Sequence, residues 1–115
     1  MRTLLTDESL GDAQEWVGRE RGRWMAKLVK KLEIKNKLGL HARAAALLVQ
    51  TVNRFSAEVK IAKDGQVVDG RSILGVLTLA ATRGSKIHVE ANGEDAEEAM
   101  RALEKLVEKK FYESE

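Results

Sequence analysis

The chain has 115 residues, 43% of them hydrophobic, which suits one compact domain and leaves little material for a second core. It contains no cysteine, so disulfide frameworks and thiolate metal sites are excluded, and nothing favours an oxidising compartment. The net charge of +2 is unevenly spread: residues 29–93 carry eleven basic and five acidic side chains, residues 94–115 four and eight. A basic body favours an acidic partner surface, whereas scattered lysines and 4% aromatic residues argue against nucleic acid.

Residues 1–27 differ in pattern from the rest of the chain. Three glycines within them each weaken a helix by about 1 kcal/mol relative to alanine, and the apolar residues show only a broken period. We therefore interpret 1–27 as an N-terminal extension of uncertain structure and 28–115 as the domain. One interpretation of the extension is a frayed helix that docks a tryptophan. Another is that translation starts at Met25, which leads directly into the first predicted strand.

The N-terminal residues do not predict a signal peptide. Acidic residues from Asp7 to Glu15 interrupt any apolar run before it reaches secretory length. No apolar stretch is long enough to span a membrane. We therefore expect a cytoplasmic protein with no membrane partner.

The first part of the domain alternates strand and helix patterns. Leu32 and Ile34 alternate with charged residues, which predicts a half-buried strand, and a polar turn over 36–39 ends it. From His41 onward the apolar spacing is helical. One stripe of this predicted helix contains Ala45, Leu48, Val49, Val52 and Phe55.

A hairpin pattern follows this helix. Val59 and Ile61 alternate with Lys60, and Asp64-Gly65 supplies the two left-handed residues of a tight turn before the second strand.

The second half predicts two further helices separated by a strand. Ser72 is placed to cap an apolar helix over 73–81, and Gly84 closes this segment. Ile87 and Val89 mark the next strand, and the spacing of Asp95 and Glu98 resembles a capping box. The stripe of the terminal helix contains Ala96, Ala99, Met100, Leu103, Leu106 and Val107.

The predicted order of elements is β-α-β-β-α-β-α. Because every predicted strand has one apolar face, the simplest packing is a four-stranded antiparallel sheet with three helices on one side. The fold class is therefore α+β.

His41 is the residue whose position suggests chemistry. It lies where a glycine-containing turn becomes a helix, beside amides that lack helical partners and can bind an anion. Neutral imidazole is a nucleophile, and Arg43 adds a cation that pairs well with phosphate oxygens. The alternative is that His41 is an ordinary surface residue at a helix start. Spacing alone leaves both interpretations open.

Two motifs make the chain resemble the HPr family of phosphocarrier proteins. The family motif Gly-Leu-His-Ala-Arg-Pro-Ala is matched at Gly39, Leu40, His41, Ala42, Arg43 and Ala45. The segment from Arg71 to Val76 is similar to the regulatory-serine segment of the same family. The resemblance extends from Leu28 to Tyr112. It departs from the motif at Ala44, where the family usually has proline, and we expect the helix to form nevertheless, with looser geometry around His41.

The resemblance implies an open-faced β-sandwich and a role in the bacterial phosphoenolpyruvate-dependent phosphotransferase system. His41 would accept a phosphoryl group through Nδ1 from enzyme I and donate it to enzyme IIA proteins, with Arg43 stabilising the phosphate. Such a protein is a stoichiometric carrier rather than an enzyme. The family implies no cofactor and no metal ion, and we expect a monomer.

Ser72 and its apolar neighbours each have two interpretations. Ser72 is a preferred helix cap, but the resemblance also implies a regulatory site for an HPr kinase/phosphorylase. The apolar run after it is too long for one buried stripe, so some of it should face outward. The residues assigned to partner docking, against an alternative role in the core, are Ala46, Leu47, Ile73, Leu74 and Leu77.

A second class of function stays open from the sequence. An HPr-like regulatory module would act by docking on a kinase or a transcriptional regulator, in a nitrogen-type branch rather than in sugar transport. His41 and Arg43 favour the carrier. His88 lies in an alternating strand and is interpreted as a solvated side chain.

Overall fold

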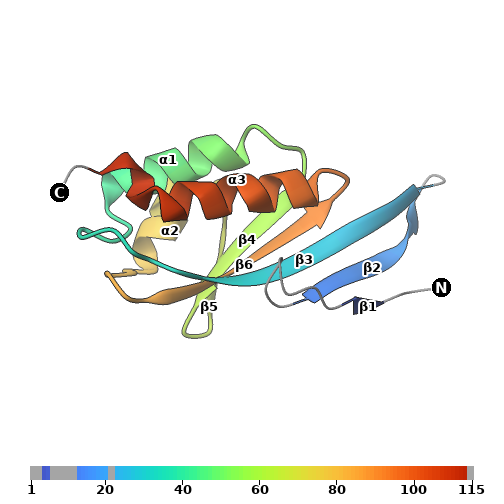
Figure 1. The fold of residues 1–115 in the computed structure, drawn as a ribbon, viewed down its shortest axis with the longest axis horizontal. Coiled ribbons are helices and arrows are strands. Elements are labelled where there is room, and N and C mark those ends of the chain that lie inside the picture. The colour runs from blue at the N-terminus through green and yellow to red at the C-terminus, as the bar shows by residue number, and fades with distance from the viewer. Residues whose placement is uncertain (1–3, 6–12, 21–22, 114–115) are drawn as a thin grey trace.

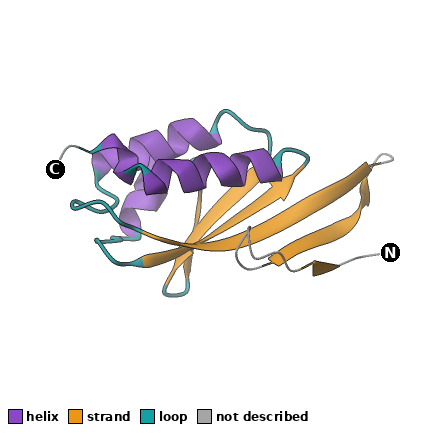
Figure 2. Ribbon diagram, in the orientation of Figure 1, coloured by secondary structure: helices purple, strands orange, loops and turns teal. Residues whose placement is uncertain are grey.

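The computed structural model describes residues 4–5, 13–20 and 23–113, with side chains described from residue 27. Its strands are β1 (Leu4–Leu5), β2 (Ala13–Glu20), β3 (Arg23–Glu33), β4 (Glu58–Lys63), β5 (Gln66–Asp69) and β6 (Lys86–Gly93). Its helices are α1 (Ala42–Val52), α2 (Ile73–Thr78) and α3 (Ala96–Glu108), followed by a short helical turn, η1 (Lys110–Tyr112). The helices lie on one face of a single sheet, so the fold has two layers (Figures 1 and 2).

The sheet is antiparallel and has the strand order β1-β2-β3-β6-β4-β5. Its last four members are the predicted strands, so the predicted α+β fold with three helices on one face is confirmed. Asp64 and Gly65 join β4 to β5 with φ angles of 51° and 84°, which confirms the predicted tight turn.

The N-terminal extension contributes strands, and the prediction of a frayed helix is wrong. β2 pairs with β3 over a register that runs from Ala13 opposite Val29 to Glu20 opposite Arg23. Pairing satisfies backbone groups along the edge of β3 that would otherwise need water, which favours a strand over a helix there. β3 also crosses the predicted boundary between residues 27 and 28. The predicted docking of a tryptophan concerns side chains outside the described residues.

The core lies between the sheet and the helices. Ile61 of β4, Ile87 of β6 and Ile34, which directly follows β3, are fully buried, and each such side chain contributes roughly 1.5–3 kcal/mol. The predicted stripes of α1 and α3 are buried against them, with Phe55 partly buried at the margin. On the same face, Lys30 of β3 forms an ion pair with Glu104 of α3 and so joins the two layers.

Two helix ends differ from the sequence prediction. α2 ends at Thr78 rather than Ala81, because Ala80 adopts a left-handed φ of 50° that a right-handed helix cannot contain. Asp95 precedes α3, but its side chain makes no capping hydrogen bond, so the predicted capping box is wrong.

The carboxylate of Asp95 instead binds the loop before β4. It accepts hydrogen bonds from the amides of Ser56 (2.9 Å) and Ala57 (2.8 Å) and from the hydroxyl of Ser56 (3.3 Å). Partial desolvation acts to raise the pKa of Asp95, but these hydrogen bonds outweigh it, so the pKa lies below its ordinary value. Asp95 therefore joins the start of α3 to the segment that follows α1.

A left-handed turn ends the described chain. Lys110, Phe111 and Tyr112 have φ angles of 55°, 54° and 55°, which cost roughly 1–2 kcal/mol each for residues other than glycine. Phe111 is buried in the core, which offsets part of this cost. The turn redirects the chain after α3, so that Glu113 returns to the loop between β3 and α1 (Figure 1).

Candidate functional site

The loop between β3 and α1 fixes the position of His41. Gly39 has a φ of 67°, and a Cβ at this position would collide with the carbonyl oxygen of Ala81. The amide of Leu40 donates to the same oxygen at 2.9 Å, and the Leu40 side chain is buried. The backbone that leads into His41 is therefore held against the segment that follows α2.

His41 is the residue immediately before α1 and leaves the first amides of that helix free of helical partners. Its backbone is extended, with φ −78° and ψ −179°, and its side chain makes no capping hydrogen bond. The first helical bond runs from the amide of Ala45 to the carbonyl of His41 at 2.8 Å. The amides of residues 42–44 precede it, and together with the helix dipole they favour an anion at this point.

Arg43 supplies a cation in the first turn of α1, two residues after His41. Its side chain is exposed, and among the described residues it takes part in no hydrogen bond or ion pair. Ala44 is fully buried, and α1 begins at Ala42, so the helix forms without the motif proline, as predicted. His41, the free amides and Arg43 thus lie close together at one helix end.

Glu113 is a further member of the site that the sequence analysis did not select. Its Oε2 lies 3.9 Å from Nε2 of His41, and the side chains are 10% and 29% exposed respectively. The Leu38 amide donates to both carboxylate oxygens at 3.1 and 3.3 Å. Buried Asn36 donates through Nδ2 to Oε2 of Glu113 at 3.2 Å. No motif signals this contact, because Leu38 and Glu113 are 75 positions apart.

The surroundings of Glu113 keep its carboxylate ionised. Desolvation acts to raise the pKa of Glu113, but the hydrogen bonds from Leu38 and Asn36 and the charges of His41 and Lys37 outweigh it. The pKa of Glu113 therefore lies below its ordinary value.

Ser72 is the cap of α2, as predicted. Its Oγ accepts a hydrogen bond from the amide of Gly75 at 2.9 Å, and the side chain is half-buried. Gly75 sits close against this cap, because a Cβ there would lie 3.1 Å from Oγ of Ser72. The capping role is confirmed, and it leaves the regulatory role a prediction.

The predicted docking residues divide into two groups. Ile73 and Leu74 are 42% and 76% exposed, which confirms that part of the apolar run faces outward. Leu47 and Leu77 are partly buried and pack against the core, and Ala46 is half-buried. Their neighbour Val76 lies wholly in the core.

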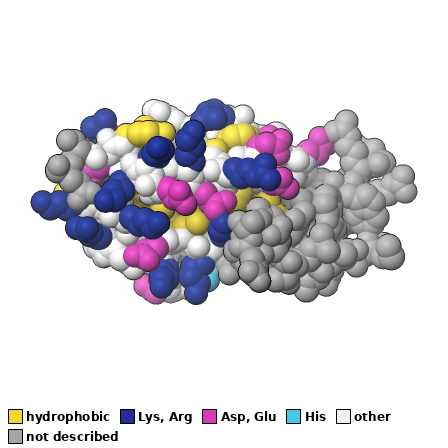
Figure 3. Space-filling view, viewed as in Figure 1, with side chains coloured by type: hydrophobic (Ala, Val, Ile, Leu, Met, Phe, Trp, Pro, Cys, Tyr) yellow, Lys and Arg dark blue, Asp and Glu magenta, His cyan; other side chains and the backbone are white. Residues whose placement is uncertain are grey.

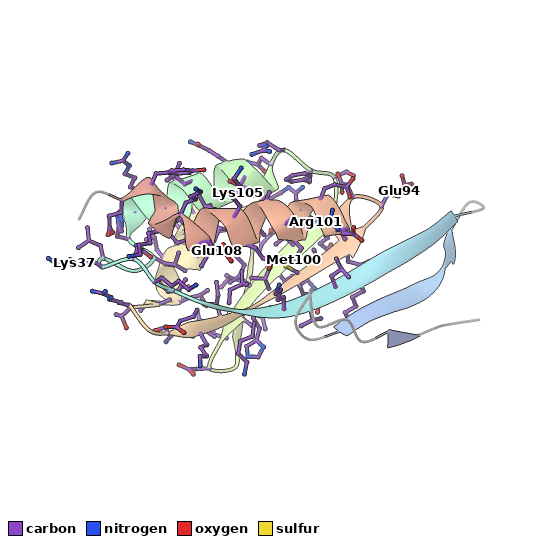
Figure 4. All side chains as sticks on the ribbon, in the orientation of Figure 1. Lys37, Glu94, Met100, Arg101, Lys105 and Glu108 are labelled. Atoms are coloured by element: carbon purple, nitrogen blue, oxygen red, sulfur yellow. The ribbon has the colours of Figure 1, made fainter. Side chains whose placement is uncertain are left out.

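Basic and acidic side chains are interspersed over the face of the molecule shown in Figure 3. A groove of 490 Å³ between α1 and α3 is lined in part by Leu47, Arg54, Arg101 and Lys105, the last two labelled in Figure 4. Arg101 is paired with Glu97 at 2.6 Å, so its charge is partly neutralised.

The remaining titratable residues show no second site. His88 is exposed in β6, opposite Ala62 of β4 and Lys31 of β3. In the part of the chain that the structure describes, no three His, Asp or Glu side chains are grouped so that they could hold a metal ion. Over the same residues, no helix is long and apolar enough to cross a membrane.

A family model, curated proteins and solved structures that are similar to this chain all carry HPr in their descriptions. Residues 28–109 match the family described as PTS HPr component phosphorylation site. The chain is 46% identical over 86 residues to phosphocarrier protein HPr of Xylella fastidiosa strain Temecula1, covering 75% of this chain and 97% of that protein. It is 49% identical over 80 residues to HPr-like protein Crh of Halalkalibacterium halodurans, covering 70% and 95%. The crystal structure of HPr-C-His from Thermoanaerobacter tengcongensis aligns with this chain with a TM-score of 0.72 and 45% identity. The alignment covers 76% of this chain and 98% of that one.

Proposed function

Because the chain belongs to the HPr family of phosphocarrier proteins of the phosphotransferase system, we propose that His41 accepts a phosphoryl group from enzyme I and donates it to enzyme IIA proteins. The observation that carries the proposal is the position of His41 beside the free amides of α1 and the exposed cation of Arg43. The protein is then phosphorylated by one partner and dephosphorylated by another, so it acts as a stoichiometric carrier in the cytoplasm.

The site suits transient binding of a phosphoryl group. Its oxygens would meet the amides of Ala42 and Arg43 and the guanidinium of Arg43, which stabilise negative charge as the group arrives. Ala42 and Arg43 are exposed at the start of α1, so these donors do not lie in a closed pocket. A carrier must release the group as readily as it accepts it, and an open site avoids holding it too tightly.

The partner surface in this proposal surrounds α2 and the first half of α1. Ile73 and Leu74 provide exposed apolar area for a partner. The partly buried residues assigned to the edge of this surface are Ala46, Leu47 and Leu77. The excess of basic over acidic residues in positions 29–93 favours an acidic partner face.

Ser72 is the proposed regulatory site, acted on by an HPr kinase/phosphorylase. A phosphate there would add about two negative charges next to Ile73 and Leu74. The position at the start of a helix tolerates negative charge, so the effect would arise from repulsion of an acidic partner rather than from unfolding.

A second candidate function is regulation by docking alone. It is favoured by the similarity to HPr-like protein Crh of Halalkalibacterium halodurans and of Bacillus subtilis, the latter 43% identical over 79 residues. One solved relative is described as an HPr dimer, whereas we propose that this chain acts as a monomer.

Incubation with phosphoenolpyruvate and enzyme I separates the two candidates. The carrier should acquire one acid-labile phosphate per chain on His41 and lose it when an enzyme IIA protein is added. A protein that gains no phosphate, but binds a regulator with an affinity that depends on Ser72, would support the docking function instead.

A further inference from the structure

The ring of His41 has an ionised carboxylate on the side opposite its nucleophilic nitrogen. Glu113 Oε2 lies 3.9 Å from Nε2, a distance at which an ion pair forms once the ring gains charge. A neutral imidazole carries its proton on one ring nitrogen only. A carboxylate beside Nε2 favours the proton there, and the lone pair is then on Nδ1.

Glu113 is held by the same loop that ends in His41. The Leu38 amide donates to both of its carboxylate oxygens, and Asn36 Nδ2 donates to Oε2. Asn36 also donates through Nδ2 to the Gly39 carbonyl at 2.7 Å, so it links the carboxylate to the turn before His41. Within the described residues, the buried Oδ1 of Asn36 has no hydrogen-bond partner. The same side-chain amide of Asn36 contacts both the Glu113 carboxylate and the turn that precedes His41.

The backbone before Glu113 is strained. Three successive residues other than glycine, 110–112, take left-handed angles immediately before Glu113. Phe111 is buried in this turn, and the direction of the chain after it carries Glu113 back to Leu38. The carboxylate is therefore directed to the loop and to His41 by the backbone as well as by its hydrogen bonds.

We propose that Glu113 is a positioning residue for phosphoryl transfer, which holds the proton of His41 on Nε2 and leaves Nδ1 to attack phosphorus. The inference rests on the proposed function of His41. As the Nδ1 lone pair forms the N–P bond, the bond between phosphorus and the donor atom breaks, and its electron pair leaves with the donor. The proton stays on Nε2, and the positive charge that the ring gains is stabilised by Glu113. The same contact assists the reverse step, in which the N–P electron pair returns to Nδ1.

Glu113 contacts the ring, and two cations lie nearby in the sequence. Glu113 faces Nε2, Lys37 acts on the same carboxylate, and Arg43 follows on α1. Figure 4 shows Lys37 at the end of the molecule where the loop after β3 lies. Because both cations remain in a Glu113 variant, a change in the ring can be assigned to the carboxylate.

The test compares Glu113→Gln with Glu108→Gln, an exposed residue of α3 that serves as the matched control. Nitrogen-15 NMR at about pH 9, where imidazole is neutral, measures the two tautomers of His41 in the unphosphorylated full chain. We expect the Nε2–H form to predominate in the wild type, and its ratio to the Nδ1–H form to fall at least threefold in E113Q. Phosphoryl acceptance should slow by roughly threefold to tenfold in E113Q at unchanged KM for enzyme I. E108Q should change neither quantity.

Glu113→Asp separates charge from structure. It keeps the carboxylate, so it should recover most of the wild-type tautomer ratio. Equal defects in E113Q and E113D, or an unchanged ratio in E113Q, would overturn the role of Glu113 while leaving phosphoryl acceptance by His41 intact. Failure of the wild type to accept phosphate would instead remove the proposed function, and the tautomer ratio would still report on Glu113.

Discussion

The starts of α1 and α2 are built alike in backbone but differ in how their first amides are used. Both follow an extended residue, His41 in one and Ser72 in the other. At α2 the serine hydroxyl occupies the Gly75 amide, whereas at α1 the histidine ring caps nothing. The amides of α1 are thus available to an external anion.

The start of α3 extends this comparison. Asp95 has the right chemistry for a cap, but its carboxylate binds Ser56 and Ala57 in another loop. A helix start therefore indicates an anion site only when its first residue cannot cap and a cation lies nearby. Of the three α-helices described, α1 has both features, in His41 and Arg43.

Removal of the His41 side chain at the start of α1 is expected to have the largest effect. We predict that His41→Ala abolishes phosphate acceptance but lowers the free energy of unfolding by no more than about 1 kcal/mol, because the ring forms no cap. His88→Ala, which removes the other histidine from an exposed strand position, should retain full acceptance. Acid-labile labelling with enzyme I measures both variants. Full labelling of H41A would refute the assignment of the acceptor.

Reversing the charge at Arg43 tests whether the amides suffice. We predict that Arg43→Glu slows phosphoryl acceptance by roughly tenfold or more, because the phosphate loses a cation and meets a carboxylate. Lys86→Glu makes the same change in net charge at an exposed position of β6 and serves as the control. Equal rates in the two variants would mean that long-range charge, rather than local pairing, governs transfer.

Ser72 offers a way to separate capping from regulation at α2. Ser72→Asp keeps a capping oxygen, so stability should hold, while acceptance from enzyme I should fall several-fold through repulsion near Leu74. Ser72→Ala should do the reverse, losing about 1 kcal/mol of stability with near-normal transfer. Rates measured at two salt concentrations would show the electrostatic origin. A wild-type rate in S72D, with the same salt dependence, would leave Ser72 a cap only.

The smallest effect concerns Asp95 at α3. Its pKa is lowered in the folded protein, so its contribution to stability is present above the ordinary value of 3.8 and is lost as pH falls through the folded pKa. We predict that Asp95→Asn lowers the free energy of unfolding by about 1 kcal/mol at neutral pH. Urea unfolding at a series of pH values below 3.8 should show this difference shrinking as the pH falls. A difference that does not depend on pH would show that the charge of Asp95 is irrelevant.

Local patterns in the sequence predicted most of the fold. The turn at Asp64-Gly65, the cap at Ser72 and the buried stripes of α1 and α3 each depend on residues a few positions apart. His41 and Arg43 could be selected for the same reason, since the helix start that positions them is local.

The features that were missed depend on distant contacts. Asp95 has the sequence of a cap, but the amides that bind it lie 38 and 39 positions earlier. β2 follows no clear strand period and forms by pairing with β3. Glu113 reaches His41 only because the left-handed turn redirects the chain after α3. Periodicity carries no information about such contacts.

The hydrogen bond between Leu38 and Glu113 also determines how late during synthesis the site around His41 can be completed. The two residues are 75 positions apart, so a ribosome that has just made Leu38 must add a long stretch before the carboxylate is available. At roughly 5–20 residues per second, that interval is about 4–15 seconds. Throughout this time the surroundings of His41 would lack the Glu113 carboxylate. The site would be complete only after the segment that follows α3 had folded back onto the loop before α1, which makes its final geometry a late event in folding.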